Sequence, residues 1–243
     1  MSMAIITGAS GGIGAAAAEK LAQAGHDICA GYFGNRESAA ALCCELITKY
    51  GVRAEAVRFD LSDTAGIAGS VSECVSLLGE PDILVNNGGC EYIGLFQDMT
   101  DSDIIGLMNS DLIGSILLTK YIIKGMISRK RGYIVNVASV WGEVGASCEV
   151  IYSAAKSGLI GFTRALAKEA APSGVIVNAV SPGFIDTRMN SQLSDEERRD
   201  LIADIPADRA GTPKDVAEAI AFLCSGKADY IAGQVLRVDG GWV

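Results

Sequence analysis

The sequence predicts a single-domain α/β fold in which a doubly wound, seven-stranded parallel sheet carries helices on both faces. Short apolar or β-branched runs alternate with longer segments of helical periodicity, and the first short run leads directly into a glycine-rich turn. Such alternation produces right-handed crossovers between parallel strands. With 243 residues, 49% of them hydrophobic, and no visible linker or repeat, we expect one domain over 1–243.

Seven short runs have the length and composition of strands. They are Ala4–Thr7, Asp27–Tyr32, Ala54–Phe59, Ile83–Asn86, Tyr133–Ala138, Val175–Val180 and Val235–Val238. Helical patterns between them cover 12–24, 36–50, 64–78, 102–129, 151–171 and 213–225. Each strand but the last is thus followed by a helix, as a parallel sheet requires.

The first glycine-rich turn has the setting of a phosphate-binding loop. Gly8, Gly12 and Gly14 lie between the first strand and the first helix. Glycines there allow a tight turn, close approach of the backbone to a pyrophosphate, and close packing of helix on strand. A flexible turn without a ligand is the alternative, which the strand–turn–helix order disfavours.

Composition narrows the possible partners. The net charge of −9, with one basic cluster at Arg129, Lys130 and Arg131, argues against nucleic acid. No apolar run reaches the roughly 18 residues that span a bilayer, and the glycine motif follows the start too closely for a signal peptide. Seven cysteines without CxxC spacing indicate reduced thiols, no metal site and a cytoplasmic location.

A second group of residues has the chemistry of acid–base catalysis. Tyr152 and Lys156 are four residues apart, so they share one face of the predicted helix. The lysine charge favours phenolate and is expected to lower the tyrosine pKa. Ser139 follows the fifth strand, at the sheet edge where ligands bind in such folds. Alone, the Tyr–Lys pair would be an ordinary surface pair; Ser139 favours a site.

These motifs occur in one order together with several others. The chain carries Thr7-Gly8-x-x-x-Gly12-x-Gly14, Asn86-Asn87-Gly88-Gly89, Ser139, Tyr152-x-x-x-Lys156, Pro182-Gly183 with Thr187, and Val238-Asp239-Gly240-Gly241. Together they resemble the short-chain dehydrogenase/reductase family over essentially the whole chain, most closely its 3-oxoacyl-[acyl-carrier-protein] reductase branch. The resemblance implies a single Rossmann-fold domain that transfers hydride between a nicotinamide cofactor and a carbonyl or alcohol.

The resemblance also implies catalytic roles. Tyr152 is the general acid in reduction, Lys156 tunes it and binds the nicotinamide ribose, and Ser139 hydrogen-bonds the substrate carbonyl. One position departs from the family, because Asp111 stands where the family carries a catalytic asparagine. An ionised aspartate only accepts hydrogen bonds, so a water relay at Asp111 is expected to be altered or pH-dependent.

NADP(H) is favoured over NAD(H). Tyr32 stands where an acidic residue would bind the ribose of NAD, and Arg36 follows as a cation for a 2′-phosphate, although a solvated helix-start charge is an equal reading of Arg36. Gly11 replaces an arginine found in many NADP-using relatives. The full set of expected cofactor contacts is Thr7, Gly8, Ser10, Gly12, Ile13, Gly14, Tyr32, Arg36, Asp60, Leu61, Asn86, Gly88, Tyr152, Lys156, Pro182, Gly183, Ile185 and Thr187.

The substrate is left open by the sequence. Trp141 and Cys148 lie in the loop between Ser139 and Tyr152 and are expected, with those two residues, to face it. Reduction of a 3-oxoacyl thioester is the first reading. A carbonyl reductase or alcohol dehydrogenase for a steroid, sugar-derived or other small ketone is the second, and a catalytically idle nicotinamide-binding module is the third.

Two kinds of protein contact are also expected. Arg129, Lys130 and Arg131 match a basic patch that docks acyl carrier protein in the similar reductases, whereas a solvated helix end is the alternative. The helices near 102–129 and 151–171 resemble the dimer-forming pair of the family, and the apolar end Gly241–Val243 resembles its second contact. A homotetramer is therefore expected.

Overall fold

A computed structural model describes residues 2–191 and 193–243. In this part of the chain seven parallel strands form one sheet in the order β3-β2-β1-β4-β5-β6-β7. The strands are β1 (Met3–Ile6), β2 (Asp27–Tyr32), β3 (Ala54–Arg58), β4 (Ile83–Asn86), β5 (Gly132–Val137), β6 (Val175–Pro182) and β7 (Val235–Val238). The predicted fold class is confirmed.

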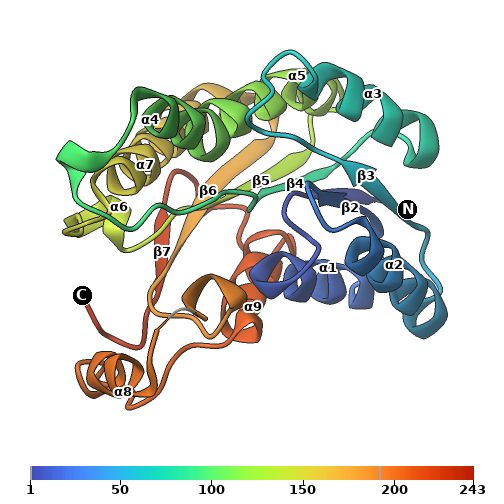
Figure 1. Cartoon of the computed structure of the whole chain (residues 1–243). Coiled ribbons are helices and arrows are strands. Elements are labelled where there is room, and N and C mark those ends of the chain that lie inside the picture. Colours follow the sequence, from blue (N-terminus) through green and yellow to red (C-terminus); the bar gives the residue numbers. More distant parts are fainter. Residues whose placement is uncertain (1, 192) are drawn as a thin grey trace.

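Helices cover both faces of the sheet (Figure 1). One layer holds α1 (Gly12–Gln23), α2 (Arg36–Tyr50) and α9 (Pro213–Leu223). The other holds α3 (Ile67–Leu78), α4 (Asp101–Met108), α5 (Gly114–Arg129) and α7 (Val150–Ala170). Shorter elements are η1 (Phe96–Asp98), η2 (Asn109–Ile113), α6 (Trp141–Val144), η3 (Ala171–Ser173), η4 (Arg188–Asn190) and α8 (Asp195–Ala203).

Each face of the sheet has its own hydrophobic core. Buried side chains such as Leu21 and Ile220 join α1 and α9 to one face, and Ile67 and Leu118 join α3 and α5 to the other. The central strands are buried on both faces, which explains why β1 and β4 read as unbroken apolar runs instead of alternating patterns.

The predicted helix over 102–129 contains an interruption. Asn109–Ile113 forms a π-helical turn between α4 and α5. A π-turn accommodates one extra residue in a helix, and such turns often occur at functional sites. A Cβ at Gly114 would lie 2.4 Å from the carbonyl oxygen of Leu61, so the helix approaches the loop after β3 closely here.

The strand order creates the crevice that positions the site. The chain winds from β1 outward through β2 to β3, then returns to β4 on the other side of β1. Loops that leave β1 and β4 therefore separate at the carboxyl edge of the sheet, where ligands bind in open α/β folds. The glycine turn follows β1 at this edge, and Ser139 follows β5.

Candidate active site

A cavity of about 920 Å³ lies at this carboxyl edge. Its size is in the range of small-molecule and cofactor sites. Most of the residues predicted for the site line it: Thr7, Gly8, Ser10, Gly12, Ile13, Asp60, Leu61, Gly88, Asp111, Ser139, Tyr152, Lys156, Pro182, Gly183, Ile185 and Thr187. The cavity therefore joins the glycine turn to the Ser–Tyr–Lys group.

The glycine turn has the shape of an anion cradle. Gly8 and Gly12 have positive φ angles of 67° and 55°, which favour glycine. A Cβ at Gly14 would lie only 2.3 Å from the carbonyl oxygen of Gly8. The N-cap residue of α1 is Gly11, which has no side chain to cap the helix, so the first backbone N–H groups of α1 are placed to bind a phosphate. These features fit the pyrophosphate of a dinucleotide.

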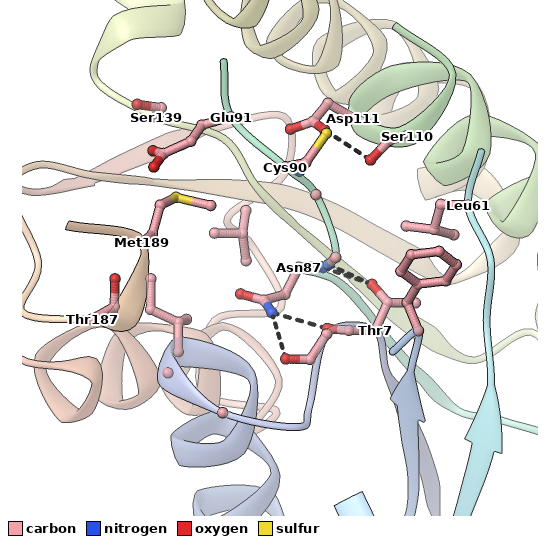
Figure 2. Close-up of a pocket in the computed structure, with 18 of the residues that line it drawn as sticks. Thr7, Leu61, Asn87, Cys90, Glu91, Ser110, Asp111, Ser139, Thr187 and Met189 are labelled. Atoms are coloured by element: carbon pink, nitrogen blue, oxygen red, sulfur yellow. Dashed lines mark hydrogen bonds between the residues drawn. The ribbon is translucent and has the colours of Figure 1, made fainter. Parts of the chain in front are cut away.

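Asn87 and Thr7 hold the two separating loops together (Figure 2). The backbone N–H groups of Asn87 and Gly88 donate to the Thr7 hydroxyl at 3.0 and 2.7 Å. The Asn87 amide donates back to the carbonyl oxygens of Thr7 and Gly8 at 2.9 and 3.4 Å. This mutual bonding fixes the floor of the cavity between β1 and β4.

The residues of the predicted catalytic group come from separate elements. Tyr152 and Lys156 lie in the first turns of α7, and the Lys156 Nζ is 5.4 Å from the centre of the Tyr152 ring. Ser139 follows β5 and its hydroxyl accepts a hydrogen bond from the Trp141 N–H at 3.2 Å. All three line the cavity, and Lys156 is only 4% exposed.

Asp111 reaches the same group from the π-turn η2. It is 1% exposed, and its Oδ2 lies 3.2 Å from the Lys156 Nζ. Its Oδ1 accepts hydrogen bonds from the Cys90 N–H at 2.8 Å and from the Ser110 hydroxyl at 3.0 Å (Figure 2). Lys156 also donates to the Val137 carbonyl at 3.3 Å. A buried ion pair thus borders the tyrosine.

The expected lowering of the Tyr152 pKa is wrong, because the net shift is upward. Burial raises the pKa of Tyr152, and Asp111 raises it further, while Lys156 and the Ser139 hydroxyl oppose them. Burial alone would lower the pKa of Lys156, but the Asp111 charge outweighs it and the net shift is upward. Tyr152 is therefore a neutral phenol at neutral pH and Lys156 an ammonium.

Asn86, one of the predicted cofactor contacts, is not among the described residues that line the cavity. It is 1% exposed. Its side-chain amide donates to the Thr119 hydroxyl at 3.0 Å and to the side-chain oxygen Oδ1 of Asn136 at 2.8 Å. Asn136 in turn donates to the Thr163 hydroxyl at 2.8 Å. These contacts give Asn86 a structural role in a buried polar network.

Other predicted residues also lie outside the described cavity lining. Gly14 packs below the glycine turn, and the neighbours of Tyr32 and Arg36, namely Phe33, Gly34 and Asn35, line the cavity instead. Trp141 packs edge-on against Trp242, with ring centres 5.0 Å apart. Cys148 is half-buried in the loop between α6 and α7. Trp141 and Cys148, which the sequence predicts to face the substrate, are not among the described residues that line the cavity.

Several lining residues were missed by the sequence reasoning. Cys90, Glu91 and Ser110 border the catalytic group, and Met189 lies opposite Ser139 (Figure 2). Their signal was available, because Cys90 and Glu91 directly follow the Asn86–Gly89 motif and Met189 follows Thr187. Glu149, at the start of α7, has a pKa raised to about 7 by burial and by the nearby charge of Glu91.

The basic cluster is already paired with acidic residues. Arg129 lies 3.3 Å from Glu80 and 3.6 Å from Asp82, and Arg131 lies 3.6 Å from Asp82. The cluster precedes β5, whereas Ser139 follows it, so the two lie at opposite edges of the sheet. Pairing of this kind weakens the attraction of the cluster for an acidic partner.

Metal-binding clusters and membrane-spanning helices are absent from residues 2–191 and 193–243. These residues hold no cluster of histidine, cysteine and carboxylate side chains suited to a metal ion. None of their helices is both long and apolar enough to cross a bilayer.

The doubly wound fold, the glycine cradle and the Ser139, Tyr152 and Lys156 group meet at one cavity, an arrangement typical of nicotinamide-dependent oxidoreductases. Comparisons with known proteins narrow this class. A family model described as enoyl-(acyl carrier protein) reductase matches residues 8–243. The uncharacterized oxidoreductase YmfI of Bacillus subtilis is 43% identical over 98% of both chains. The 3-oxoacyl-[acyl-carrier-protein] reductase FabG of Aquifex aeolicus is 43% identical over 98% of this chain and 96% of its own.

A solved structure of a similar protein has the same fold. A putative gluconate dehydrogenase from Agrobacterium tumefaciens has a TM-score of 0.94 and 32% identity, covering 99% of this chain and 95% of its own. The chain belongs to the short-chain dehydrogenase/reductase family. It is an oxidoreductase that acts on CH–OH groups and their carbonyl counterparts with a nicotinamide cofactor.

Proposed function

We propose that this protein reduces a 3-oxoacyl thioester to the 3-hydroxyacyl thioester with NADPH. The observation that carries the proposal is the convergence of Ser139, Tyr152 and Lys156 at one cavity with the glycine cradle. The likeness to FabG proteins supports the thioester as substrate. Seven unpaired cysteines support a reducing, cytoplasmic setting.

The roles of the residues follow from their protonation and position. A nicotinamide cofactor held between the glycine cradle and Lys156 would supply the hydride for the keto carbon. Tyr152 donates its phenolic proton to the carbonyl oxygen, so that a hydroxyl forms and the phenolate left behind is reprotonated from solvent. The Ser139 hydroxyl orients the carbonyl by a hydrogen bond, and the Lys156 ammonium binds the ribose and stabilises the phenolate. The ketone thus gains one hydride from the cofactor and one proton from Tyr152 and becomes the alcohol.

NADPH is preferred in this proposal because the adenosine end of the cavity lacks a blocking carboxylate at the end of β2. Tyr32 ends that strand, and Phe33, Gly34 and Asn35 line the cavity after it. Arg36 begins α2, and the Arg58 guanidinium lies 5.3 Å from the centre of the Phe33 ring. Two cations thus flank the segment where a 2′-phosphate would bind.

The proposed carrier-protein contact of the basic cluster depends mainly on Lys130, because Arg129 and Arg131 are paired with Glu80 and Asp82. Its effect can be separated from catalysis. We expect Lys130→Glu to raise KM for acetoacetyl-acyl carrier protein several-fold and to leave KM for the same acyl group on a small thiol unchanged. An equal KM for the carrier substrate in both proteins would remove the cluster from the docking surface.

A second candidate substrate is a sugar-derived or other small ketone. The structural likeness to a putative gluconate dehydrogenase favours it, as does the carboxylate of Glu91 in the cavity, which can accept hydrogen bonds from substrate hydroxyls. This alternative keeps the same proton and hydride chemistry and changes only what the open end of the cavity recognises.

Oxidation of NADPH and NADH, followed in parallel, tests the proposal. Acetoacetyl thioester is offered beside cyclic, steroidal and sugar-derived ketones. The proposal predicts the highest kcat/KM with NADPH and the thioester. Turnover of another ketone alone would overturn the substrate, and cofactor binding without turnover of any carbonyl would favour an idle binding module.

A further inference from the structure

The ion pair between Asp111 and Lys156 sets two full charges beside the proposed acid. Oδ2 of Asp111 lies 3.2 Å from Nζ of Lys156, and the two residues are 1% and 4% exposed. An asparagine in place of Asp111 would leave the lysine charge uncompensated, whereas the aspartate makes the pair neutral overall. The electrostatic influence of a charge on a neighbour is largest where water is excluded.

Asp111 is held in place by its surroundings. The Cys90 N–H and the Ser110 hydroxyl both donate to Oδ1, which leaves Oδ2 directed at the lysine. A Cβ at Gly89 would lie 2.6 Å from Oδ2, so the loop after β4 closes over the carboxylate. The π-turn η2 carries Asp111 on the inner side of the helix, toward α7. These contacts fix the orientation of the Asp111 carboxylate, and Lys156 is its ion-pair partner.

The consequence for Tyr152 depends on every charge around it. Lys156 Nζ lies 5.4 Å from the Tyr152 ring and favours the phenolate, while Asp111 behind it opposes that effect. Glu149 on the same helix also disfavours the phenolate, and the Ser139 hydroxyl favours it. Among the described residues, the other titratable groups that line the cavity are Asp60, Cys90, Glu91 and Arg188.

We propose that Asp111 is a positioning residue whose ion pair with Lys156 offsets the pull of the lysine on Tyr152, which keeps Tyr152 a phenol to higher pH than an asparagine would. A phenol is the form needed to reduce a carbonyl, and a phenolate is the form needed to oxidise an alcohol. The aspartate therefore biases the site toward reduction at neutral pH. This inference rests on the proposed role of Tyr152 as acid.

The sign of the effect gives the test. Alcohol oxidation requires the Tyr152 phenolate, so its kcat rises as pH passes the apparent pKa of the tyrosine. Removal of the Asp111 charge lowers that pKa. In a plot of kcat for alcohol oxidation against pH, we therefore expect the rising limb of Asp111→Asn to lie on the order of one pH unit lower than that of the unaltered protein. Asp101→Asn removes an equal charge from the exposed start of α4 and should leave the limb in place.

The position of the rising limb distinguishes a positioning role of Asp111 from a purely structural one. A lower kcat for Asp111→Asn with an unshifted limb, or a limb moved to higher pH, would refute the proposal. The substrate for this test is the alcohol product of whichever ketone is turned over, so the result does not depend on the thioester.

A direct titration of the tyrosine covers the case in which Asp111→Asn does not fold. Tyrosinate absorbance is recorded against pH without cofactor for the unaltered protein and for Tyr152→Phe, and their difference isolates Tyr152. The proposal predicts ionisation above the ordinary tyrosine value of about 10. Ionisation well below that value with Asp111 in place would overturn it, even if no carbonyl is ever reduced and the proposed function itself fails.

Discussion

Tyr152 shows how a single residue acquires a role from its surroundings. Its spacing from Lys156 predicts a catalytic pair, and the structure brings both to the cavity with Ser139. What the spacing cannot predict is the sign of the pKa shift, because burial and the Asp111 carboxylate come from residues far away in sequence. Local spacing thus indicates the chemistry, and tertiary packing decides the protonation state.

Replacement of the phenol tests the residue-scale claim. Tyr152→Phe removes the proton donor and should lower kcat by at least about 100-fold, the lower range for general acid catalysis, with cofactor affinity nearly unchanged. Tyr133→Phe is the matched control, since the Tyr133 hydroxyl donates to Asp229 at 2.8 Å outside the cavity lining. Steady-state rates and cofactor fluorescence titration measure both. Equal loss of activity in the two variants would contradict the role of Tyr152.

At the scale of the element, the glycine turn and the central strands were predictable and the helix around Asp111 was only partly so. The turn carries its signal locally, in three glycines between a strand and a helix. The π-turn at Asn109–Ile113 lies beside the close approach of Gly114 to Leu61, a contact between distant segments. Periodicity therefore predicted the helix and missed its irregular turn.

The tight packing of α1 on the glycine turn gives a prediction at this scale. Gly14→Ala places a methyl 2.3 Å from the Gly8 carbonyl oxygen, so the turn must shift. We expect a loss of about 1–3 kcal/mol in the free energy of unfolding, together with weaker cofactor binding. Gly69→Ala in α3 meets no atom within 4 Å and should stabilise the fold by about 0.5–1 kcal/mol. Urea denaturation of both variants, with cofactor titration, decides the matter; unchanged binding in Gly14→Ala would count against the cradle.

The buried polar network joins β4, β5, α5 and α7. Thr163→Val removes the acceptor of the Asn136 amide and should cost about 1–3 kcal/mol of stability, the usual range for a buried group left unpaired. Since this network lies outside the cavity lining, kcat per folded molecule should stay the same. A selective loss of kcat without destabilisation would show that the network serves catalysis instead of packing.

For the whole molecule, the alternation of strands and helices sufficed to predict the parallel sheet and its switch point, and hence the edge where the cavity lies. The positions of Trp141 and Cys148 could not be predicted, because the loop between Ser139 and Tyr152 folds into the short helix α6 and packs Trp141 on Trp242. A loop that contacts the distant end of the chain has no local signal for its path.

Assembly is a prediction at the same scale. Large apolar side chains stay exposed on α4, α5 and near the chain end, among them Ile105, Tyr121, Ile127 and Val243. Burial of such residues between copies is a common basis of oligomers, so we expect a homotetramer with four times the chain mass of 25.2 kDa. Sedimentation equilibrium measures it, and a monomer at micromolar concentration would refute it.

Transfer of label from the cofactor to the substrate tests directly whether this site passes a hydride to a 3-oxoacyl thioester. NADPH deuterated at the reactive carbon of its nicotinamide is incubated with acetoacetyl thioester, and the product is examined by mass spectrometry. We expect the unaltered protein to form a 3-hydroxybutyryl thioester with one deuterium at C3. Formation of this product should be nearly abolished in Tyr152→Phe. An unlabelled product, or no product although the cofactor binds, would contradict hydride transfer to a 3-oxoacyl thioester by this site.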